Sequence, residues 1–134
     1  MGNESKVRYG FGKQVEMTSE AAVAAVTAAL AAEGFGIVSE IDVAATMKKK
    51  LEKEMPPYRI LGACNPVLAS RAIEAEPSIG LLLPCNVVVR QDAAGAVLVE
   101  FMDPASVLEL VDRPGIEELA GEVRSRLLRV MNAL

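Results

Sequence analysis

The spacing of apolar residues predicts a long amphipathic helix near each end of the chain. In the first helix, Val23, Val26 and Leu30 follow the i, i+3, i+7 spacing of one helical face. Alanine fills most other positions, and Gly34 is placed to adopt the left-handed conformation that ends a helix. The second helix follows Pro114-Gly115, and its apolar stripe comprises Ile116, Leu119, Val123, Leu127, Val130 and Leu134. Each helix therefore has one face that must be buried against another layer.

Runs of apolar residues, several of them alternating with polar residues, predict five strands. These strands cover residues 9–15, 36–42, 58–64, 81–89 and 96–102. Pro84 interrupts the fourth strand, so we expect it to mark a bulge, an edge position or a crossover between two strand segments. Residues 92–95 predict the hairpin loop that joins the last two strands.

Helix-start signals predict three shorter helices. Asn65-Pro66 and Asp103-Pro104 each place a capping side chain before a proline at the first helical position. The helices that follow cover residues 66–75 and 105–111. Asp42 caps the third short helix, and four lysines lie on its polar side. The apolar stripe of this helix consists of Val43, Met47 and Leu51.

Together these elements predict the α+β fold class. The expected architecture is a curved, mainly antiparallel sheet with the two main helices packed on one face, in a β-α-β-β-β-β-α-like order with short extra helices. We assign residues 1–14 to an N-terminal segment that contains the candidate first strand, and residues 15–134 to a single α+β domain. The sequence contains no linker, repeat or low-complexity tract.

The composition excludes several classes of function. The chain has no histidine, so it lacks the usual general base near neutral pH, every Ser-His-Asp or Cys-His arrangement and every histidine-ligated metal site. A net charge of -4 disfavours binding of nucleic acid or of an anionic membrane, because either requires a clustered positive field. The apolar stretches are shorter than the ~20 residues that span a bilayer. We therefore expect a non-catalytic domain with no cofactor.

The two cysteines, Cys64 and Cys85, are too few for a fold held together by disulfides. The N-terminal residues lack the basic and then apolar pattern of a signal peptide. These observations predict a cytoplasmic protein with reduced thiols. A Cys64–Cys85 disulfide would require the two strands that carry these residues to be neighbours.

The predicted sheet has more apolar surface than the two long helices can cover. Residues 81–89 are apolar on both sides apart from Asn86, and each exposed Å² of apolar surface forgoes roughly 25 cal/mol. The short helices, a ligand or another copy of the chain must cover the second face. Because a symmetric dimer commonly buries such a face, we predict a homodimer. A monomer whose short helices cover the face is the alternative.

Two stretches of the chain resemble the signature segments of the domain of unknown function 302 family. The first is YRILGACNP at residues 58–66, followed by Leu68-Ala69, and the second is IGLLLPCNVVV at residues 79–89. Gly34-Phe35, before a strand that ends at Asp42, and Asp103-Pro104, after the hairpin, fit the same pattern. The resemblance spans about residues 15–134.

This resemblance implies a small prokaryotic domain with a fold similar to the TATA-box-binding-protein-like class. That fold is a curved antiparallel sheet with two main helices on one side, and some members of the family resemble homodimers. The family has no established activity, so the resemblance implies architecture and candidate positions but no reaction. A shared fold is also no reason to expect DNA binding.

Two mirrored tripeptides, Cys64-Asn65-Pro66 and Pro84-Cys85-Asn86, form the candidate binding or thiol site. If their strands are neighbours, both thiols and both amides can converge. Cys64 lies just before a helix N-terminus, where the amide dipoles lower the pKa of a thiol. Two thiolates could hold a soft ion such as Cu(I) or Zn(II), with Met47 or Met102 as further ligands. They could instead carry sulfur chemistry or form a redox disulfide.

Ordinary structural roles also explain these residues. Cys85 lies on the apolar core face of its predicted strand, where cysteine packs as a small apolar group. Helix capping explains Asn65, and helix initiation explains Pro66. Core packing is therefore our preferred interpretation of the cysteines. A weaker candidate is a carboxylate site, and it would need neighbouring strands to align Glu40, Asp42, Glu100 and Asp103.

The sequence therefore predicts a cytoplasmic homodimer that binds a small molecule or a partner in the groove of its sheet, without catalytic activity. The absence of any self-sufficient catalytic constellation and the surplus apolar face support this hypothesis. The alternative is a thiol-dependent protein that handles sulfur, redox equivalents or a soft metal through Cys64 and Cys85.

Overall fold

The computed structural model describes residues 7–134, so positions 1–6 of the predicted N-terminal segment lie outside the described residues. The strands are β1 (Gly10–Val15), β2 (Gly36–Asp42), β3 (Tyr58–Cys64), β4 (Cys85–Gln91) and β5 (Val97–Met102). The α-helices are α1 (Ser19–Ala32), α2 (Val43–Leu51), α3 (Pro66–Ala75), α4 (Pro104–Val107) and α5 (Ile116–Asn132). Two short 3-10 helices, η1 (Pro77–Leu82) and η2 (Leu108–Leu110), complete the set.

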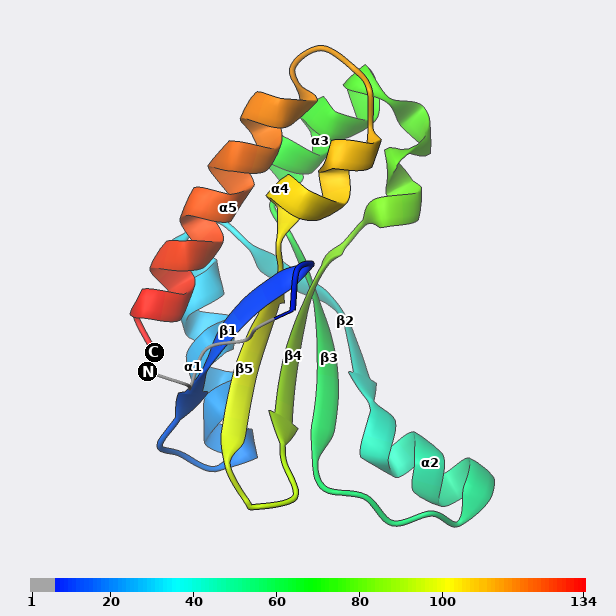
Figure 1. The fold of residues 1–134 in the computed structure, drawn as a ribbon, viewed down its shortest axis with the longest axis vertical. Helices are drawn as coiled ribbons and strands as arrows, with labels where there is room; N and C mark the ends of the chain where they lie inside the picture. Colours follow the sequence, from blue (N-terminus) through cyan, green and yellow to red (C-terminus); the bar gives the residue numbers. More distant parts are fainter. Residues whose placement is uncertain (1–6) are drawn as a thin grey trace.

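The five strands form one sheet in the order β1-β5-β4-β3-β2, and every neighbouring pair is antiparallel. Figure 1 shows this sheet with α1 and α5 on one of its faces. The α+β fold class and the two-helix cover predicted from the sequence are therefore confirmed. β1 extends across residue 14, so residues 10–14 belong to the sheet.

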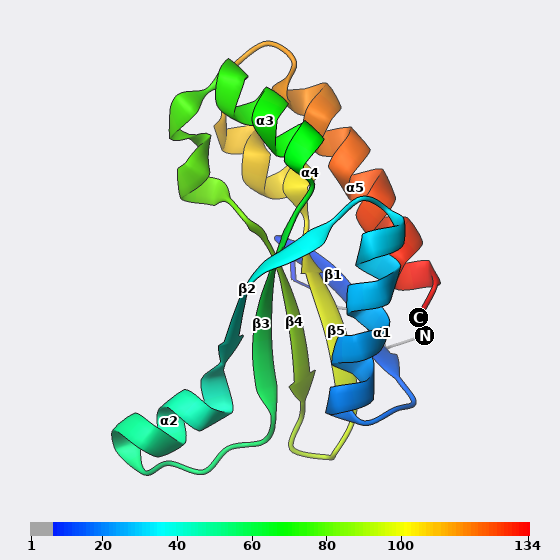
Figure 2. The same ribbon diagram turned by 180° about the vertical axis from the view of Figure 1, so that it is seen from behind.

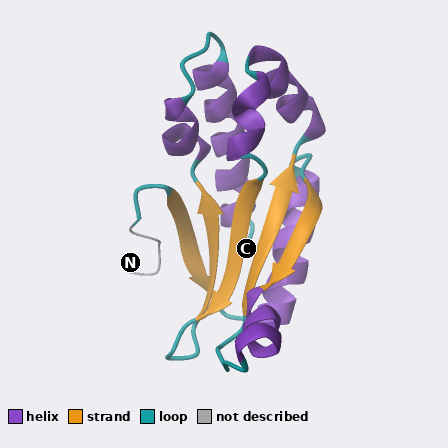
Figure 3. Ribbon diagram, turned by 90° about the vertical axis from the view of Figure 1, so that its right-hand side faces the viewer, coloured by secondary structure: helices purple, strands orange, loops and turns teal. Residues whose placement is uncertain are grey.

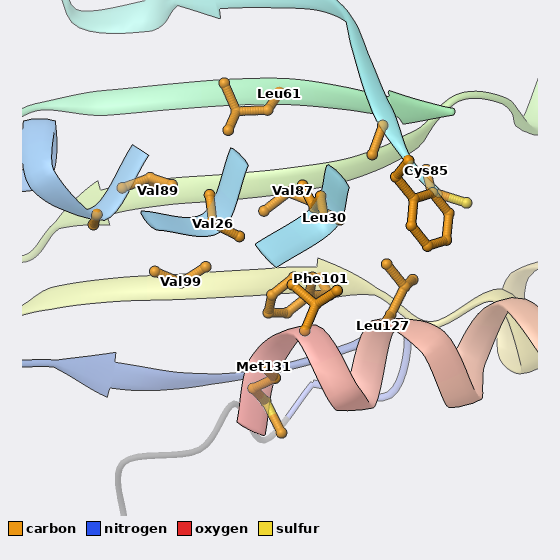
Figure 4. Close-up of a cluster of buried hydrophobic side chains, with 14 of the residues drawn as sticks. Val26, Leu30, Leu61, Cys85, Val87, Val89, Val99, Phe101, Leu127 and Met131 are labelled. Atoms are coloured by element: carbon orange, nitrogen blue, oxygen red, sulfur yellow. The ribbon is translucent and has the colours of Figure 1, made fainter. Parts of the chain in front are cut away.

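Alternation along the strands separates a buried face from an open one. In β5, Val97, Val99 and Phe101 are buried, whereas the three residues between and after them are only half-buried. The buried residues of β3, β4 and β5 meet Val26 and Leu30 of α1, and Leu127 and Met131 of α5, in one apolar core (Figure 4). We call this the sheet core. Burying one face of each element against another layer stabilises the domain.

A second, smaller core lies beyond one end of the sheet. It comprises Ala72, Ile79, Leu108, Ile116 and Ala120, which come from α3, η1, η2 and α5. We call it the helical-end core, and Figure 2 shows these elements gathered above the strands. Because neighbouring strands are antiparallel, β3 ends, β4 begins and β5 ends at the same edge of the sheet. The topology therefore gathers α3, η1 and α4 at that edge.

The predicted strand over residues 81–89 is wrong in its first part. Residues 77–82 form η1, and β4 begins only at Cys85. Pro77 and the Glu76 side chain, which accepts a hydrogen bond from the Ser78 N–H at 3.1 Å, set the start of this turn. Leu81 and Leu82 therefore lie in a helical turn and Leu83 is the extended residue that follows it, with Leu81 88% exposed. The Leu83–Pro84 bond is cis, and Pro84 precedes the strand instead of forming a bulge within it.

The short helices do not cover the second face of the sheet. α3, η1 and α4 lie at its end, and α2 projects from the end of β2 on the side opposite to α1 and α5 (Figure 1). α2 has no buried residue, and its Leu51 is 66% exposed. Figure 3 shows the sheet face that the helices of the described residues leave uncovered. We call it the open face.

Among the described residues, none of the helices combines the length and the apolar character that a bilayer crossing requires.

We expect Leu30→Ala to destabilise the domain by about 2–5 kcal/mol, because Leu30 is fully buried between α1 and the sheet. Leu81→Ala on η1 is the matched control, and its effect should stay within about 0.5 kcal/mol because that side chain is 88% exposed. Urea denaturation followed by circular dichroism measures both. Equal effects of the two substitutions would contradict the assignment of the sheet core.

Candidate functional site

A pocket of about 300 Å³ lies at the end of the sheet, between the two cores. Its wall contains members of the sheet core, among them Phe35, Ala63 and Leu68. It also contains Ala72 and Leu108 of the helical-end core. We call it the sheet-end pocket. The pocket lies where the sheet core and the helical-end core meet, and we call this line of contact the seam.

The side chains around the seam explain why it stays open. Leu119 of α5 packs against both cores, so it bridges them beside the pocket. The wall that faces this separation is built partly from small residues, Ala69 and Ala72 of α3 and Gly80 of η1. A Cβ atom added at Gly80 would meet no other atom within 4 Å. The chain therefore places its smallest side chains where the two cores leave space.

Four of the six candidate residues from the sequence line this pocket: Cys64, Asn65, Pro84 and Cys85. The other two do not. Pro66 is exposed as the first residue of α3, and Asn86 lies on the open face. The structure therefore brings the two cysteines and one of the two amides to a common pocket, and it separates the second amide from them.

The two cysteines are free and lie on neighbouring strands, since Cys85 pairs in register with Ala63, the residue before Cys64. Cys85 is 6% exposed. Burial raises the pKa of the Cys85 thiol from its ordinary value of 9.0 to about 11, and the nearby Cys64 adds to the rise. Cys85 is therefore protonated at neutral pH. Neither Met47 nor Met102, the further metal ligands considered above, lines this pocket.

Asn65 is the polar residue of the pocket wall, and it is only 8% exposed. Its Oδ1 atom accepts a hydrogen bond from the Leu68 N–H at 3.2 Å, which caps α3 as the sequence predicts. The side chain packs against Gly34, where an added Cβ would lie 2.8 Å from Asn65 Nδ2. Gly34 has a φ of 86°, so both the backbone conformation and this close approach require glycine.

A second pocket, of about 430 Å³, lies on the open face and includes Asn86 in its wall. Arg90 of β4 and Glu100 of β5 are diagonal neighbours across the two strands, and Arg90 Nε donates to Glu100 Oε1 at 2.7 Å. This hydrogen bond is the main cause that raises the pKa of Arg90. Tyr58 and Val88 lie beside the pair in the same wall. The open face is therefore a mixed apolar and polar surface that includes an Arg90–Glu100 ion pair.

The four carboxylates considered as a site do not gather. Glu40 and Asp42 both face Arg59 on β3, with Glu40 Oε2 2.7 Å from Arg59 Nη1. Glu100 is paired with Arg90 as described, and Asp103 caps α4 and binds Arg124. In residues 7–134, no group of three or more cysteine or carboxylate residues could hold a metal ion.

Sequence reasoning missed most of the apolar wall, including Phe35, Leu83 and Leu119. Leu119 belongs to a helical stripe that was predicted correctly, but a stripe does not show which residues bridge two cores. Leu83 was placed in a strand that does not exist at that position. The mirrored tripeptides were the sequence feature that indicated this pocket, because each contributes two residues to its wall.

Comparisons with known proteins identify relatives of the whole domain. The family model described as "Domain of unknown function DUF302" matches residues 11–134. The crystal structure of an uncharacterized conserved protein DUF302 from Bacillus stearothermophilus is similar, with a TM-score of 0.87 and 24% sequence identity. The match covers 95% of this chain and 98% of that chain, and it shows a shared fold. No curated protein matches the chain.

We expect the stability of the domain to fall as pH rises from about 9 to about 11. The unfolded chain ionises Cys85 near its ordinary pKa of 9.0, whereas the folded protein ionises it only near 11, so alkali favours the unfolded state. The shift corresponds to a loss of roughly 2–3 kcal/mol. Urea denaturation at a series of pH values measures it.

Cys85→Ala provides the comparison, because it removes this thiol and leaves all other groups that titrate in alkali. The slope of stability against pH should be shallower in Cys85→Ala than in the wild-type protein. Identical slopes would contradict the raised pKa of the buried thiol.

Proposed function

The chain belongs to the DUF302 family of domains of unknown function, and we propose that it is a small-molecule-binding module without catalytic activity. Its ligand occupies the sheet-end pocket. One observation carries this proposal: the pocket has an apolar wall, and it lies between two cores that pack without filling it. An apolar concavity with a few polar groups is the usual form of a ligand site.

The size of the pocket limits the ligand. About 300 Å³ is at the small end of ligand sites. At about 30 Å³ for each water-sized group, it accommodates about ten non-hydrogen atoms. We expect dissociation constants between micromolar and millimolar, which correspond to about 8 to 4 kcal/mol. For ten atoms this is about 0.8 to 0.4 kcal/mol per atom, within the range of about 0.3 to 1.5 kcal/mol that small ligands reach.

The same pocket argues against the thiol alternative. Soft metal ions bind thiolates, and nucleophilic sulfur chemistry also needs the thiolate form. The buried Cys85 has a pKa raised to about 11, so forming its thiolate at neutral pH is unfavourable. Packing as a small apolar group agrees with its place in the sheet core. An apolar ligand therefore fits the residues of this wall better than a soft metal ion.

We also infer that the module is a cytoplasmic homodimer whose second copy docks on the open face. Ile41, Ile60 and Val88 lie side by side across β2, β3 and β4 on this face, and Ile41 is 49% exposed. The projecting α2 adds exposed apolar surface on the same side of the sheet. A two-fold dimer would bury both surfaces at once. The two free cysteines support a reducing compartment.

The ligand-binding proposal predicts that isopropylbenzene, a compact apolar probe, binds the protein and that Ala69→Phe prevents this. Ala69 lies in the pocket wall, so a phenyl ring at this position fills the space that the probe needs. We expect at least a tenfold loss of affinity, since each 1.4 kcal/mol is a factor of ten. Titration followed by protein NMR shifts measures the binding.

Ser70→Phe is the matched control, because Ser70 is the next residue of α3, is exposed and is absent from the wall. This variant should bind isopropylbenzene as the wild-type protein does. If the wild-type protein binds no probe, or if the two variants behave alike, the proposed pocket function is wrong.

The dimer proposal predicts a solution mass of twice 14.2 kDa by size-exclusion chromatography with light scattering. Ile41→Glu should produce monomers, because it introduces a charge into the apolar row of the open face. Ala28→Glu adds the same charge on the exposed side of α1, over the covered face, and should leave the dimer intact. A wild-type monomer at micromolar concentration would refute the dimer.

A further inference from the structure

The connection between β2 and β3 is longer than the sheet requires. Asp42, the last residue of β2, pairs in register with Arg59 of β3, so a short turn could join the two strands. The chain instead inserts residues 43–57, which form α2 and the segment that returns to β3. No residue of α2 is buried. Ordering a segment costs conformational entropy, and α2 gains little burial within its own chain in return, which indicates a contact with another molecule.

α2 and the short helices α3, η1, α4 and η2 lie at opposite ends of the sheet. β2 ends and β3 begins at the α2 end, whereas β3 and β5 end at the other. We call residues 66–82 and 104–118 the helical end. The helical end borders the open face, because Val107 of α4 lies in the wall of the pocket on that face with Val88 and Arg90. α2 stands on the same side of the sheet (Figure 1). The open face therefore has α2 at one end and the helical end at the other.

The two ends carry opposite charge. Residues 43–57 contain four lysines and two glutamates, so their net charge is +2. The helical end contains six acidic residues and two arginines, so its net charge is -4. Ion pairs within each end, Lys48 with Glu54 and Glu76 with Arg113, leave these net charges unchanged. Exposed charges at the two ends include Lys49, Lys50, Glu109 and Asp112.

Two-fold symmetry allows two ways to stack the open faces of two copies. A symmetry axis along the strands places like ends together, with α2 against α2. A symmetry axis across the strands places α2 of each copy against the helical end of the other. The first arrangement brings charges of the same sign together at both ends, and the second brings opposite charges together at both ends. Electrostatic interactions therefore favour the second arrangement.

We propose that α2 binds the helical end of a second copy of this chain, in an antiparallel two-fold dimer whose open faces meet. This inference rests on the proposed dimer and specifies which surfaces of the two copies touch. Leu51 of α2 and Leu110 of η2, which are 66% and 80% exposed, add apolar surface at the two ends. Each copy contributes one basic and one acidic surface, so the dimer contains the same contact twice.

Two charge-reversed variants test this arrangement. Lys49→Glu/Lys50→Glu reverses charge on α2, and Glu109→Lys/Asp112→Lys reverses charge at the helical end. All four side chains are exposed, so both variants should fold. The first variant makes the chain more negative and the second makes it less negative, so a general effect of net charge would change their dimer affinities in opposite directions. Analytical ultracentrifugation at low ionic strength measures the dissociation constants.

We expect each variant alone to dimerise at least tenfold more weakly than the wild-type protein, because both contacts then bring like charges together. An equimolar mixture of the two variants should form heterodimers with about wild-type affinity, since both contacts then join opposite charges. A mixture of Lys49→Glu/Lys50→Glu with the wild-type protein should form heterodimers that are weaker than the wild-type dimer, because one of the two contacts is repulsive.

Several results would overturn the arrangement and leave the dimer proposal standing. Tighter heterodimers between Lys49→Glu/Lys50→Glu and the wild-type protein would show that α2 contacts α2. Unchanged affinity of both variants would place α2 and the helical end outside the interface. Opposite shifts of the two variants, or a mixture of them no tighter than either alone, would also exclude the pairing. A wild-type monomer would show that the dimer and this arrangement are both wrong.

Discussion

The structure depends on the packing of one helix, α5, against two separate apolar cores. Leu127 and Val130 near its C-terminal end belong to the sheet core, whereas Ile116 and Ala120 near its start belong to the helical-end core. A helix of 17 residues is about 25 Å long, which is enough to reach past the end of the sheet. Because an α-helix is stiff over this length, α5 fixes the position of one core relative to the other.

The candidate site follows from this arrangement and from the antiparallel topology. The chain leaves the sheet at the end of β3, returns at the start of β4 and leaves again at the end of β5, all at one edge. The residues where the chain leaves or re-enters the sheet connect the sheet core to the helical-end core. They therefore support the fold and also border its surface. Asn65 shows this clearly: its Oδ1 atom caps α3, and the residue also lies in the pocket wall.

Much of the fold could be predicted because the local patterns of helix capping and strand alternation agree with the final packing of the elements. Asn65-Pro66 began a helix and alternation separated Val97 from Leu98, as expected from capping and from the two-residue period of a strand. The error at residues 81–83 has a physical cause, since a short apolar run fits either a strand or a buried helical turn. In this chain Pro77 begins the η1 turn and Pro84 lies between that turn and β4, so the apolar run does not form one continuous strand.

The candidate site was predictable only in part, because a pocket is a property of packing between distant residues. Cys64 and Cys85 were candidates because cysteine is a reactive residue type. Burial, however, raises the pKa of Cys85 and disfavours its thiolate. Leu119 is an ordinary stripe residue in the sequence, and its role at the seam appears only when both cores are known.

A ligand in the seam would contact both cores, so its binding free energy would add to their coupling through α5. This coupling would let the proposed ligand favour one arrangement of the helical end relative to the sheet.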